Sequence, residues 1–475
     1  MAAAGYRASR AGTFAAGAGD HRLMRIAELA DRRVAVWGFG REGRATIAAV
    51  REQLPHLPLT LYCSESEIDA AHRFDNALIV RGQEPDAIAL SVFDVVVKSP
   101  GISAYKPAIL AAQAHGTQFT SGTALWFAEN PGAHVIAVTG TKGKSTTSAM
   151  IAHLARSLGV RTALAGNIGL PLLELRGQSA ELWVIELSSF QTGEAASLEL
   201  GVITSLYEEH LDWHGSREQY VIDKLRLVDA SRQLLVNALQ PVLMERTQEH
   251  PHRLLFGQLS GWHVADGFIR RGADEVFPTA QLAAPGLHNA LNACAALAAL
   301  ADIGMDALAA APSLANFLPL PHRLQPLGER NGFHWINDSI STTPQATLAA
   351  LESLRGQSVT VLVGGYDRGV DWTAFVEAMS ATPPHAIICM GSNGTRIEAA
   401  LRTVDVRCSM VRVDDLATAI AEAEARTSNG GVILLSPGAP SFDQFQDYAE
   451  RGRRFTELAG FDSVAITGID GLGIG

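Results

Sequence analysis

A stretch rich in glycine and lysine could bind the phosphates of a nucleotide. Residues 135–147 read VIAVTGTKGKSTT, in which Gly140, Gly143, Lys144 and Ser145 lie between a strand-like apolar run and a helical pattern. In such a loop, backbone N–H groups hold phosphate oxygens, the lysine neutralises the β- and γ-phosphates, and the serine binds Mg²⁺. The loop is shorter than G-x-x-x-x-G-K-[ST], because Val138 occupies the place of the first glycine. A glycine turn with an exposed lysine is the alternative, and the strand–loop–helix context favours the phosphate loop.

A carboxylate follows a later strand-like run. Glu186 comes directly after the apolar residues 182–185, so it belongs at the carboxyl end of a strand. Ligands bind at that end of open α/β sheets and Mg²⁺ prefers carboxylate oxygens, which makes Glu186 a candidate metal ligand. The alternative is a strand-end charge that faces water. Ser188 and Gln191 could reach the same crevice, or could be ordinary turn and cap residues.

A histidine and a lysine could complete this site. His210 follows a strand in an acidic turn, and Lys224 lies on an apolar helix face with Val221 and Leu225. A lysine on such a face normally extends its ammonium group to water, and a single histidine is usually structural. A lysine carbamylated by CO₂ is instead an anion, which could bind a second Mg²⁺.

A second glycine turn lies near the N-terminus. Gly38, Gly40 and Gly43 form G-x-G-x-x-G after a strand expected at 33–37, and a helical pattern follows from Ala45. This is the pattern of a mononucleotide-binding half-fold, in which a diphosphate binds at the helix N-terminus. A dinucleotide site needs an acidic residue at the end of the second strand, and here that strand closes on cysteine and serine at 63–64. NAD is therefore a disfavoured alternative.

Alternating strand and helix patterns predict an α/β protein with three domains, each built on a mostly parallel sheet. We expect a disordered N-terminus at 1–21, a Rossmann-like domain at 22–121, a central phosphate-loop domain at 122–318 and a Rossmann-like C-terminal domain at 319–475. Two prolines in NFLPLPHRL mark the last boundary. We expect the final ten residues, ITGIDGLGIG, to fray.

Composition narrows the class of protein. The net charge is −11 without a basic face, which argues against a nucleic-acid partner. None of the four cysteines is spaced as C-x-x-C, so we expect neither a zinc site nor a disulfide framework. This cysteine content is typical of a protein in a reducing compartment. The most apolar helical pattern is too short to span a bilayer, and the first twenty residues lack the apolar core of a secretory signal. We expect a cytoplasmic protein without membrane insertion.

Nine motifs together resemble the Mur ligases, and most closely those of the glutamate-adding (MurD) type. The motifs cover most of residues 33–460 in the family's order: TGTKGKSTT, GNIGLP, IELSSFQ, EEHLDWHGS, GLHNALNACAA, LPHR, NDS, GGYDRGVDW and LLSPGAPSFDQFQDYAERGRRF. The resemblance implies an ATP- and Mg²⁺-dependent ligase of peptidoglycan synthesis that adds glutamate to UDP-N-acetylmuramoyl-L-alanine. The γ-phosphate would pass to the substrate carboxylate, and the amine would then displace it from the acyl phosphate. A monomer is expected.

The resemblance also assigns site residues. It assigns the ATP site to Gly140, Thr141, Lys142, Gly143, Lys144, Ser145, Thr146, Asn289, Asn292, Arg323 and Asp338. It assigns two Mg²⁺ sites to Ser145, Glu186, His210 and Lys224, the lysine carbamylated, and catalysis to Lys144, Glu186, His210 and Lys224. It assigns the UDP-substrate site to Gly38, Phe39, Gly40, Arg41, Ser99, Asn167, Ser188 and Gln191.

The expected amino-acid pocket departs from the D-glutamate ligases. By resemblance it contains Ile340, Thr342, Arg368, Ser441 and Tyr448. Ile340 replaces a lysine of those enzymes, and Arg368 aligns with another lysine. Arginine binds a carboxylate in a fixed fork and lysine binds it as a point charge, so the two carboxylates of glutamate should bind differently here. We expect L-glutamate, as in a branch whose product is later inverted by a separate epimerase, with D-glutamate as the alternative.

Three other functions are less compatible with these motifs. A folate-extending ligase of the same fold lacks an N-terminal glycine-turn domain. An NAD-dependent oxidoreductase would leave Lys144, Glu186, His210 and Lys224 without a role. The same four residues disfavour a non-catalytic binding protein.

Overall fold

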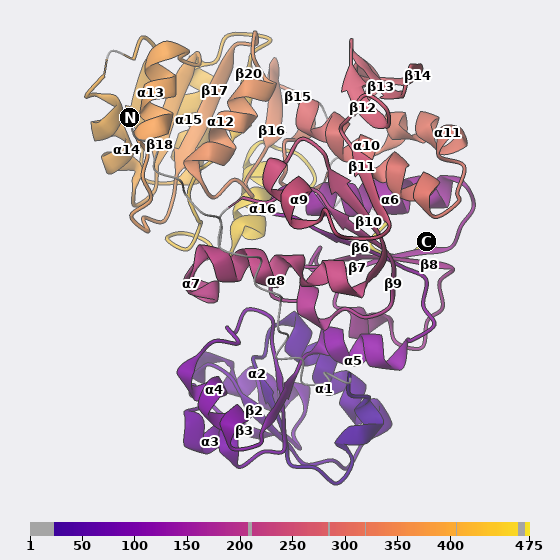
Figure 1. The fold of residues 1–475 in the computed structure, drawn as a ribbon. Coiled ribbons are helices and arrows are strands. Elements are labelled where there is room, and N and C mark those ends of the chain that lie inside the picture. Colours follow the sequence, from indigo (N-terminus) through magenta and orange to yellow (C-terminus); the bar gives the residue numbers. More distant parts are fainter. Residues whose placement is uncertain (1–22, 208–210, 284–285, 319, 405, 464–470) are drawn as a thin grey trace, which may run out of the picture. The chain divides into compact units, whose positions relative to one another are not determined.

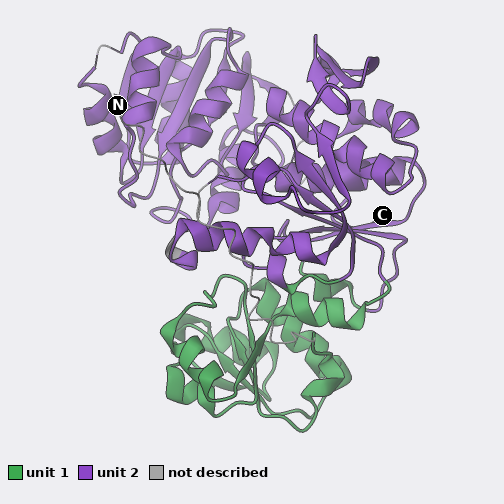
Figure 2. Ribbon diagram, in the orientation of Figure 1, with its two compact units in different colours: residues 1–132, 171–176, 194–196 green, residues 133–170, 177–193, 197–475 purple. Residues whose placement is uncertain are grey.

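The computed structural model describes residues 23–207, 211–283, 286–318, 320–404, 406–463 and 471–475. These residues form two compact units (Figure 2). Unit 1 contains the chain up to Gly132 together with Pro171–Arg176 and Glu194–Ala196. Unit 2 contains Ala133–Leu170, Gly177–Gly193 and Ser197–Gly475. The predicted division into three domains, with a boundary near residue 318, stays a prediction.

Unit 1 is built on a five-stranded parallel sheet of order β3-β2-β1-β4-β5. Its strands are β1 (Val34–Trp37), β2 (Leu59–Tyr62), β3 (Ile79–Arg81), β4 (Val95–Lys98) and β5 (Gln118–Thr120). Its helices are η1 (Ile26–Leu29), α1 (Arg41–Gln53), η2 (Glu65–Glu67), α2 (Ile68–Phe74), α3 (Ala87–Ser91), α4 (Pro107–Ala114), α5 (Gly122–Glu129) and η3 (Leu172–Leu175). β1 and β4 are buried throughout and apolar except for Lys98 at the end of β4, as expected of central parallel strands covered on both faces.

The strand order of unit 1 reverses between β1 and β4, and ligands bind beyond the strand ends at such a point. The glycine turn lies there, because Gly38 directly follows β1. Helix α1 begins at Arg41, inside the glycine motif and four residues before the predicted Ala45. Strand β3 was not predicted, because its three residues are too few to show a period.

The first sheet of unit 2 has ten strands in the order β14-β13-β12-β11-β10-β9-β6-β8-β7-β21. These strands are β6 (Val135–Thr139), β7 (Thr162–Gly166), β8 (Leu182–Glu186), β9 (Leu198–Ile203), β10 (Ser231–Asn237), β11 (Arg253–Phe256), β12 (Trp262–Ala265), β13 (Phe268–Arg271), β14 (Asp274–Pro278) and β21 (Gly473–Ile474). The helices around it are α6 (Lys144–Ser157), η4 (Thr192–Glu194), α7 (Leu211–His214), α8 (Arg217–Ala230), α9 (Pro241–Arg246), η5 (Thr279–Gln281), α10 (Leu287–Asp302), α11 (Ala307–Ala310) and η6 (Ala311–Asn316). The central strands β7, β8, β6, β9 and β10 are parallel (Figure 1).

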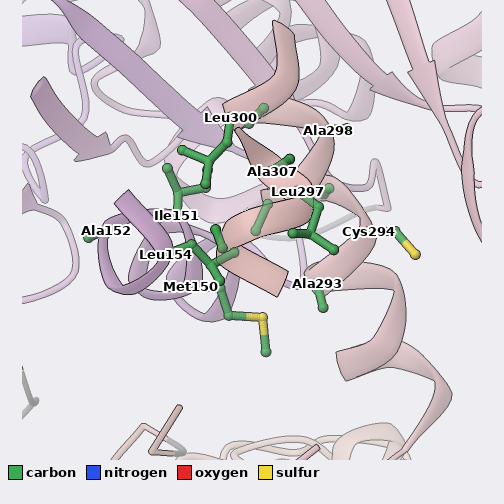
Figure 3. Packing of buried hydrophobic residues seen from close by; sticks show 14 of the residues in the cluster. Met150, Ile151, Ala152, Leu154, Ala293, Cys294, Leu297, Ala298, Leu300 and Ala307 are labelled. Atoms are coloured by element: carbon green, nitrogen blue, oxygen red, sulfur yellow. The ribbon is translucent and has the colours of Figure 1, made fainter. Parts of the chain in front are cut away.

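The core of this part of unit 2 lies between helices α6 and α10. Figure 3 shows Met150, Ile151 and Leu154 of α6 beside Leu297 and Leu300 of α10. The alanines of α10 are buried in the same cluster, and their small side chains allow the two helices to approach closely. This packing fixes α6, the helix that follows the phosphate loop.

The second sheet of unit 2 has the order β15-β16-β20-β17-β18-β19. Its strands are β15 (Gln325–Arg330), β16 (Phe333–Asn337), β17 (Val359–Gly364), β18 (Ala386–Met390), β19 (Ser409–Arg412) and β20 (Val432–Leu435). Its helices are α12 (Pro344–Ser353), α13 (Thr373–Ala381), α14 (Gly394–Leu401), α15 (Leu416–Arg426) and α16 (Tyr448–Leu458). All neighbours except β15 pair in parallel, so the loops after β16, β20 and β17 meet at one edge of the sheet.

The expectation that the C-terminal residues fray was wrong for those that the structure describes. Gly473–Ile474 forms β21, which pairs antiparallel with the edge strand β7. Arg156 donates hydrogen bonds to the carbonyl oxygens of Gly471 (2.5 Å) and Gly473 (2.9 Å). An edge strand presents unpaired backbone groups, and here the tail satisfies them. No helix among the described residues is long and apolar enough to cross a membrane.

Candidate active site

The loop between β6 and α6 has the backbone of a phosphate-binding loop. Gly143, directly before α6, has φ +86°, and a Cβ there would lie 2.5 Å from Oδ1 of Asn292. Only glycine therefore fits this position without strain. Lys144 begins α6 and its Nζ donates to the carbonyl oxygen of Thr141 (3.2 Å). The helix N-terminus and the lysine form a site suited to an anion.

Neighbouring elements hold the loop in place through Thr141 and Lys142. The hydroxyl of Thr141 lies 2.7 Å from the hydroxyl of Tyr220 on α8 and donates to the backbone of Tyr207 (3.0 Å). The Lys142 carbonyl accepts from Thr204 (2.6 Å) and its N–H donates to Ser205 (2.8 Å). A loop held at both sides is preorganised for its ligand, because little further ordering is needed on binding.

Glu186 ends strand β8 beside the phosphate loop. β8 pairs with β6 so that Glu186 is opposite Val138, two residues before Gly140. Its side chain is buried, and Oε1 accepts from Nδ2 of Asn167 (2.7 Å). Oε2 is also buried, and has no hydrogen-bond partner among the described residues. An unpaired buried carboxylate oxygen is costly unless a cation or a donor completes it.

Lys224 is buried beside the same loop. It is only 2% exposed, so it does not extend into water as lysines on apolar helix faces usually do. Nζ donates to the carbonyl oxygen of Gly140 (3.0 Å) and lies 5.1 Å from the centre of the Tyr220 ring. The structure thus brings together Gly140, Lys144, Glu186 and Lys224 around one strand end, as the sequence predicts.

The other predicted metal ligand, His210, lies outside the described residues. Sequence reasoning passed over His214, four residues further on. His214 is buried, with Nδ1 2.7 Å from Oδ2 of Asp223 and Nε2 2.9 Å from Oγ of Ser189. The sequence shows His214 in the motif DWHGS and Asp223 directly before Lys224. Nothing in the sequence indicates that these two side chains pair.

The donor set in unit 2 fits Mg²⁺. Magnesium in phosphoryl-transfer sites is usually held by one or two carboxylates with substrate phosphates and water. Glu186 offers a buried, unpaired oxygen, and Ser145 lies in the first turn of α6. The described residues contain no group of three His, Cys, Asp or Glu side chains placed to hold a metal ion by themselves.

Two predicted ATP-site asparagines line the base of the phosphate loop. Asn289 and Asn292 lie on α10 and are buried. Oδ1 of Asn292 accepts from the Thr147 hydroxyl of α6 (3.3 Å), and its Nδ2 donates to Oδ1 of Asn289 (3.4 Å). Asn292 therefore couples α10 to the loop, whatever contact Asn289 makes with a nucleotide.

The remaining predicted ATP residues lie at the second sheet of unit 2. Asp338 directly follows β16 and accepts from Ser341 (2.5 Å), Ser436 (2.8 Å) and the backbone of Leu324 (3.0 Å). Burial raises the pKa of Asp338 to about 6 in spite of these bonds. Arg323 has a buried Nε without a partner among the described residues.

The predicted amino-acid pocket occupies the loops after β16, β17 and β20. Arg368, which is exposed, donates to the carbonyl oxygen of Thr342 (3.2 Å), so the structure brings these two together. Ser441 is buried, and Ile340 is half-buried. The Tyr448 carbonyl accepts from the Ser339 hydroxyl (2.7 Å), which places the start of α16 beside the loop that contains Ile340.

Sequence reasoning did not single out Arg451, which joins the loops after β16 and β20. Its guanidinium donates to Ser339 Oγ (3.0 Å) and O (2.8 Å), to Ala439 O (3.0 Å) and to Pro440 O (3.2 Å). It is fully buried, and burial lowers the pKa of Arg451 to about 9. The sequence shows only an arginine in a charged helix, and nothing in it indicates that this arginine bonds to the distant Ser339 and to the preceding loop at Ala439 and Pro440.

The glycine turn of unit 1 differs in its side chains. A Cβ at Gly38, whose φ is +104°, would lie 2.4 Å from Ser99 Oγ, and that hydroxyl is buried without a partner among the described residues. Phe39 is buried against Phe74, with ring centres 5.7 Å apart, and Arg41 is exposed. Gly38 and Gly43 of this turn therefore lie close to a buried hydroxyl that has no partner among the described residues.

Acidic side chains accompany this turn. Desolvation raises the pKa of Glu42, in the first turn of α1, to about 7, and the charges of Glu194 and Glu174 add to the effect. Burial likewise raises the pKa of Glu194, which accepts from the Ser121 hydroxyl (2.6 Å), and lowers that of Lys98. A neutral Glu42 would leave the helix N-terminus open to an anion.

Three residues assigned to the UDP substrate lie in unit 2. Asn167 holds Glu186, as described above. Ser188 directly follows Leu187 and donates from Oγ to Oε1 of Gln191 (2.9 Å), which is 1% exposed. These contacts give all three residues a local role, and their contact with a substrate stays a prediction.

Unit 2 therefore has the parts for phosphoryl transfer. An anion-binding loop, a cationic side chain, a buried carboxylate with a vacant lone pair and a buried lysine meet at the carboxyl ends of β6 and β8. Such a site can hold a nucleoside triphosphate and neutralise the charge that develops when its terminal phosphate moves. Burial raises the pKa values of the Cys294 and Cys389 thiols to about 12.

Comparison with known proteins agrees with these features. Residues 138–300 match the model of the Mur ligase middle domain, and residues 322–438 match that of the Mur ligase glutamate ligase domain. A Xylella fastidiosa protein named UDP-N-acetylmuramoyl-L-alanine–L-glutamate ligase is 48% identical over 95% of this chain and 100% of its own. A Xanthomonas campestris protein of the same name is 49% identical over the same shares, and one from Micromonospora is 37% identical over 91% and 98%.

Solved structures are similar in fold. The Thermotoga maritima UDP-N-acetylmuramate–alanine ligase MurC superposes with a TM-score of 0.59 at 18% identity, covering 90% of this chain and 98% of its own. The MurF ligase of the same organism, solved with ADP, gives 0.54 at 16% identity over 85% and 94%. At these identities, the likeness concerns the fold alone.

Proposed function

The chain belongs to the Mur ligase family, and on that premise we propose that it joins L-glutamate to the carboxylate of UDP-N-acetylmuramoyl-L-alanine, with cleavage of ATP to ADP and phosphate. It is an ATP-dependent, amide-forming ligase of peptidoglycan synthesis. The observation that carries the proposal for the site is the meeting of Lys144, Glu186 and Lys224 at one phosphate loop. A cytoplasmic location is part of the proposal, since ATP is supplied there.

The reaction needs an activated carboxylate. An ionised carboxylate is a poor electrophile, because oxide is not a leaving group. In the first step, a substrate carboxylate oxygen attacks the γ-phosphorus of ATP and ADP leaves. In the second step, the amine nitrogen of glutamate attacks the acyl carbon of the mixed anhydride, loses a proton, and inorganic phosphate leaves as the C–N bond forms.

The phosphate loop would act in the first step. The N–H of Gly143 and the N-terminus of α6 would hold the β- and γ-phosphate oxygens, since the N–H groups of Thr141 and Lys142 already donate to Ser205. Lys144 would neutralise the negative charge that develops on the β–γ bridging oxygen as ADP leaves. Mg²⁺, held by Ser145 and Glu186, supplies further charge neutralisation when bound.

Lys224 would act as a carbamate. We propose that CO₂ modifies Nζ, which converts a buried cation beside Gly140 into an anion able to hold a second Mg²⁺ together with His210. Lys224→Ala should lose most activity, and a short carboxylic acid such as formate or acetate should restore part of it. No rescue by any carboxylate, together with no labelled lysine in ¹³C spectra after incubation with ¹³C-bicarbonate, would contradict the modification.

The choice of L-glutamate rests on two supports. The relatives that match over nearly the whole chain are named L-glutamate ligases. In addition, the pocket has Ile340 where D-glutamate ligases have a lysine, and an arginine at 368. Arg368 already contacts the Thr342 carbonyl, so a bound carboxylate would meet a fork oriented by that loop.

The test is a pair of parallel reactions. ATP, Mg²⁺ and UDP-N-acetylmuramoyl-L-alanine are supplied with pure L-glutamate or pure D-glutamate, and phosphate release and product mass are measured. Turnover with L-glutamate alone is expected. Turnover with D-glutamate alone would overturn the stereochemical assignment and retain the ligase, whereas no product with either would overturn the proposed substrates.

A further inference from the structure

Three buried side chains form a continuous hydrogen-bonded series in unit 2. Oγ of Ser189 lies 2.9 Å from Nε2 of His214, and Nδ1 of the same ring lies 2.7 Å from Oδ2 of Asp223. The three residues are 5%, 3% and 4% exposed, respectively. Buried polar groups in a series of this kind are directional, since each bond fixes the orientation of the next.

The direction of each bond follows from the tautomer of the His214 ring. In the tautomer with the proton on Nδ1, the ring donates to the Asp223 carboxylate, and Nε2 accepts from the Ser189 hydroxyl. Asp223 is itself held at Oδ1 by Gln219 Nε2 (3.1 Å) and Arg226 (3.2 Å).

The series joins two elements that each contribute to the proposed reaction. Ser189 lies three residues after Glu186, in the loop that follows β8. Asp223 directly precedes Lys224 on α8. The series therefore spans the gap between the carboxylate and the lysine that are the proposed metal ligands.

Other contacts strengthen the same connection. The Phe190 ring stacks on the Trp213 ring, with centres 4.5 Å apart and planes 22° apart. The Thr192 hydroxyl donates to the backbone oxygen of Asp223 (2.6 Å). The loop of residues 188–192 is thus attached to α7 and α8 through rings, a backbone oxygen and the Ser189–His214–Asp223 series.

We infer that His214, oriented by Asp223, is a positioning residue that holds the loop after Glu186 against helix α8 and so keeps Glu186 and Lys224 correctly spaced for acyl phosphate formation. This inference rests on the proposed function. Apolar side chains would fill the same space without buried polar groups, so filling space does not explain the series. Errors of about 1 Å in such a site cost roughly a hundredfold in rate.

The first experiment measures kcat and KM for ligation with L-glutamate. His214→Phe keeps a ring against Trp213 and Tyr220 and removes both nitrogens. We expect kcat to fall about 10- to 100-fold with KM for ATP within about threefold, because the misplaced groups act in the transition state. Ser189→Ala should also lower kcat. Ser189→Thr, which keeps the hydroxyl, should retain most activity. A kcat for His214→Phe within about twofold of the unmodified chain would overturn the inference.

A double-mutant cycle separates positioning from general damage. The side chains of Ser189 and Asp223 both contact His214, so Ser189→Ala with Asp223→Ala should lower kcat no further than the more severe single change. Neither substitution should lower kcat further in the His214→Phe chain. Losses that multiply would mean that the residues act independently, which also overturns the inference.

His250 offers a matched control. Its Nε2 lies 3.0 Å from the backbone oxygen of Ser231, at the start of β10 and away from the strand ends that carry the site. His250→Phe should lower the melting temperature and leave kcat unchanged. An equal fall in kcat for both histidine variants would show that His214 has only a structural role.

A second readout does not depend on turnover. In ¹⁵N spectra, His214 should be protonated at Nδ1, and Asp223→Ala should shift the proton toward Nε2. If the unmodified chain makes no product with either enantiomer, the proposed substrates fail. The spectra then test the series without turnover: a proton that leaves Nδ1 in Asp223→Ala supports it, and an unmoved proton contradicts it.

Discussion

The two glycine turns of this chain share a backbone arrangement and differ in the side chains around them. Each follows a central parallel strand and precedes a helix, and each contains a glycine with positive φ whose Cβ would meet a side chain. The turn in unit 2 has Lys144, Glu186 and Lys224 beside it. The turn in unit 1 has the unpaired Ser99 hydroxyl and the acidic Glu42.

This difference teaches how one backbone device serves two purposes. Backbone N–H groups and a helix N-terminus are enough to bind a phosphate that stays intact. Moving a phosphoryl group requires cations that neutralise charge as it shifts, and those must come from side chains and metal ions. We therefore expect the first turn to affect substrate binding and the second to affect the rate.

The largest effect is expected from substitutions that remove one cationic side chain from each turn. Lys144→Ala should lower kcat by about a thousandfold or more, because the charge that develops on ADP is no longer neutralised. Arg41→Ala, at the exposed start of α1, should raise the KM for the UDP substrate by less than about tenfold and leave kcat unchanged. Assays of phosphate release measure kcat and KM for both variants. Near-normal turnover by Lys144→Ala would contradict the assignment of phosphoryl transfer to the turn in unit 2.

The next effect concerns the buried carboxylate. Glu186→Gln keeps the shape and offers a neutral oxygen to Mg²⁺, so kcat should fall about a hundredfold and the Mg²⁺ concentration for half-maximal rate should rise. Calorimetry should find binding of the UDP substrate unchanged. An unaltered Mg²⁺ dependence would exclude Glu186 as a metal ligand.

A pair of glycine substitutions sharpens the separation of the two ligands. Gly143→Ala should weaken ATP binding, and Gly38→Ala should weaken binding of the UDP substrate, each by about 10- to 100-fold, since the backbone strain alone costs about 1–2 kcal/mol. Calorimetry with ADP and with UDP measures each affinity separately. If either variant lost both affinities equally, the two turns would not be independent sites.

The smallest expected effect concerns Glu42, which should change the stability of the fold. Its pKa is raised in the folded chain from 4.5 to about 7, so the stability it contributes is fully present below about pH 4.5 and is lost as the pH rises through 7. Glu42→Gln should therefore be more stable than the unmodified chain at pH 8, by up to about 3 kcal/mol, and nearly equal at pH 4.5. Denaturant unfolding at both pH values tests this, and equal stability at pH 8 would show that the carboxyl ionises freely.

Much of the fold could be read from the chain. The apolar strands at β1, β6, β8, β17, β18 and β20 have buried side chains throughout and were all expected, because strands covered on both faces need uninterrupted apolar runs. Short or half-exposed strands such as β3 and β19 were missed, since their patterns resemble those of loops.

The site divides in the same way. The sequence by itself predicted the phosphate loop and Glu186, because glycine spacing and strand ends are local features that a single chain displays, whereas the role of Lys224 was predicted from the family resemblance. Only the tertiary structure decided that His214 pairs with Asp223 and Ser189, that Arg451 joins the loops after β16 and β20, that Glu42 lies near Glu194, and that the C-terminal strand pairs with β7. Those contacts join different elements, and their stability depends on burial. Periodicity predicts burial for one element but does not predict which two side chains meet.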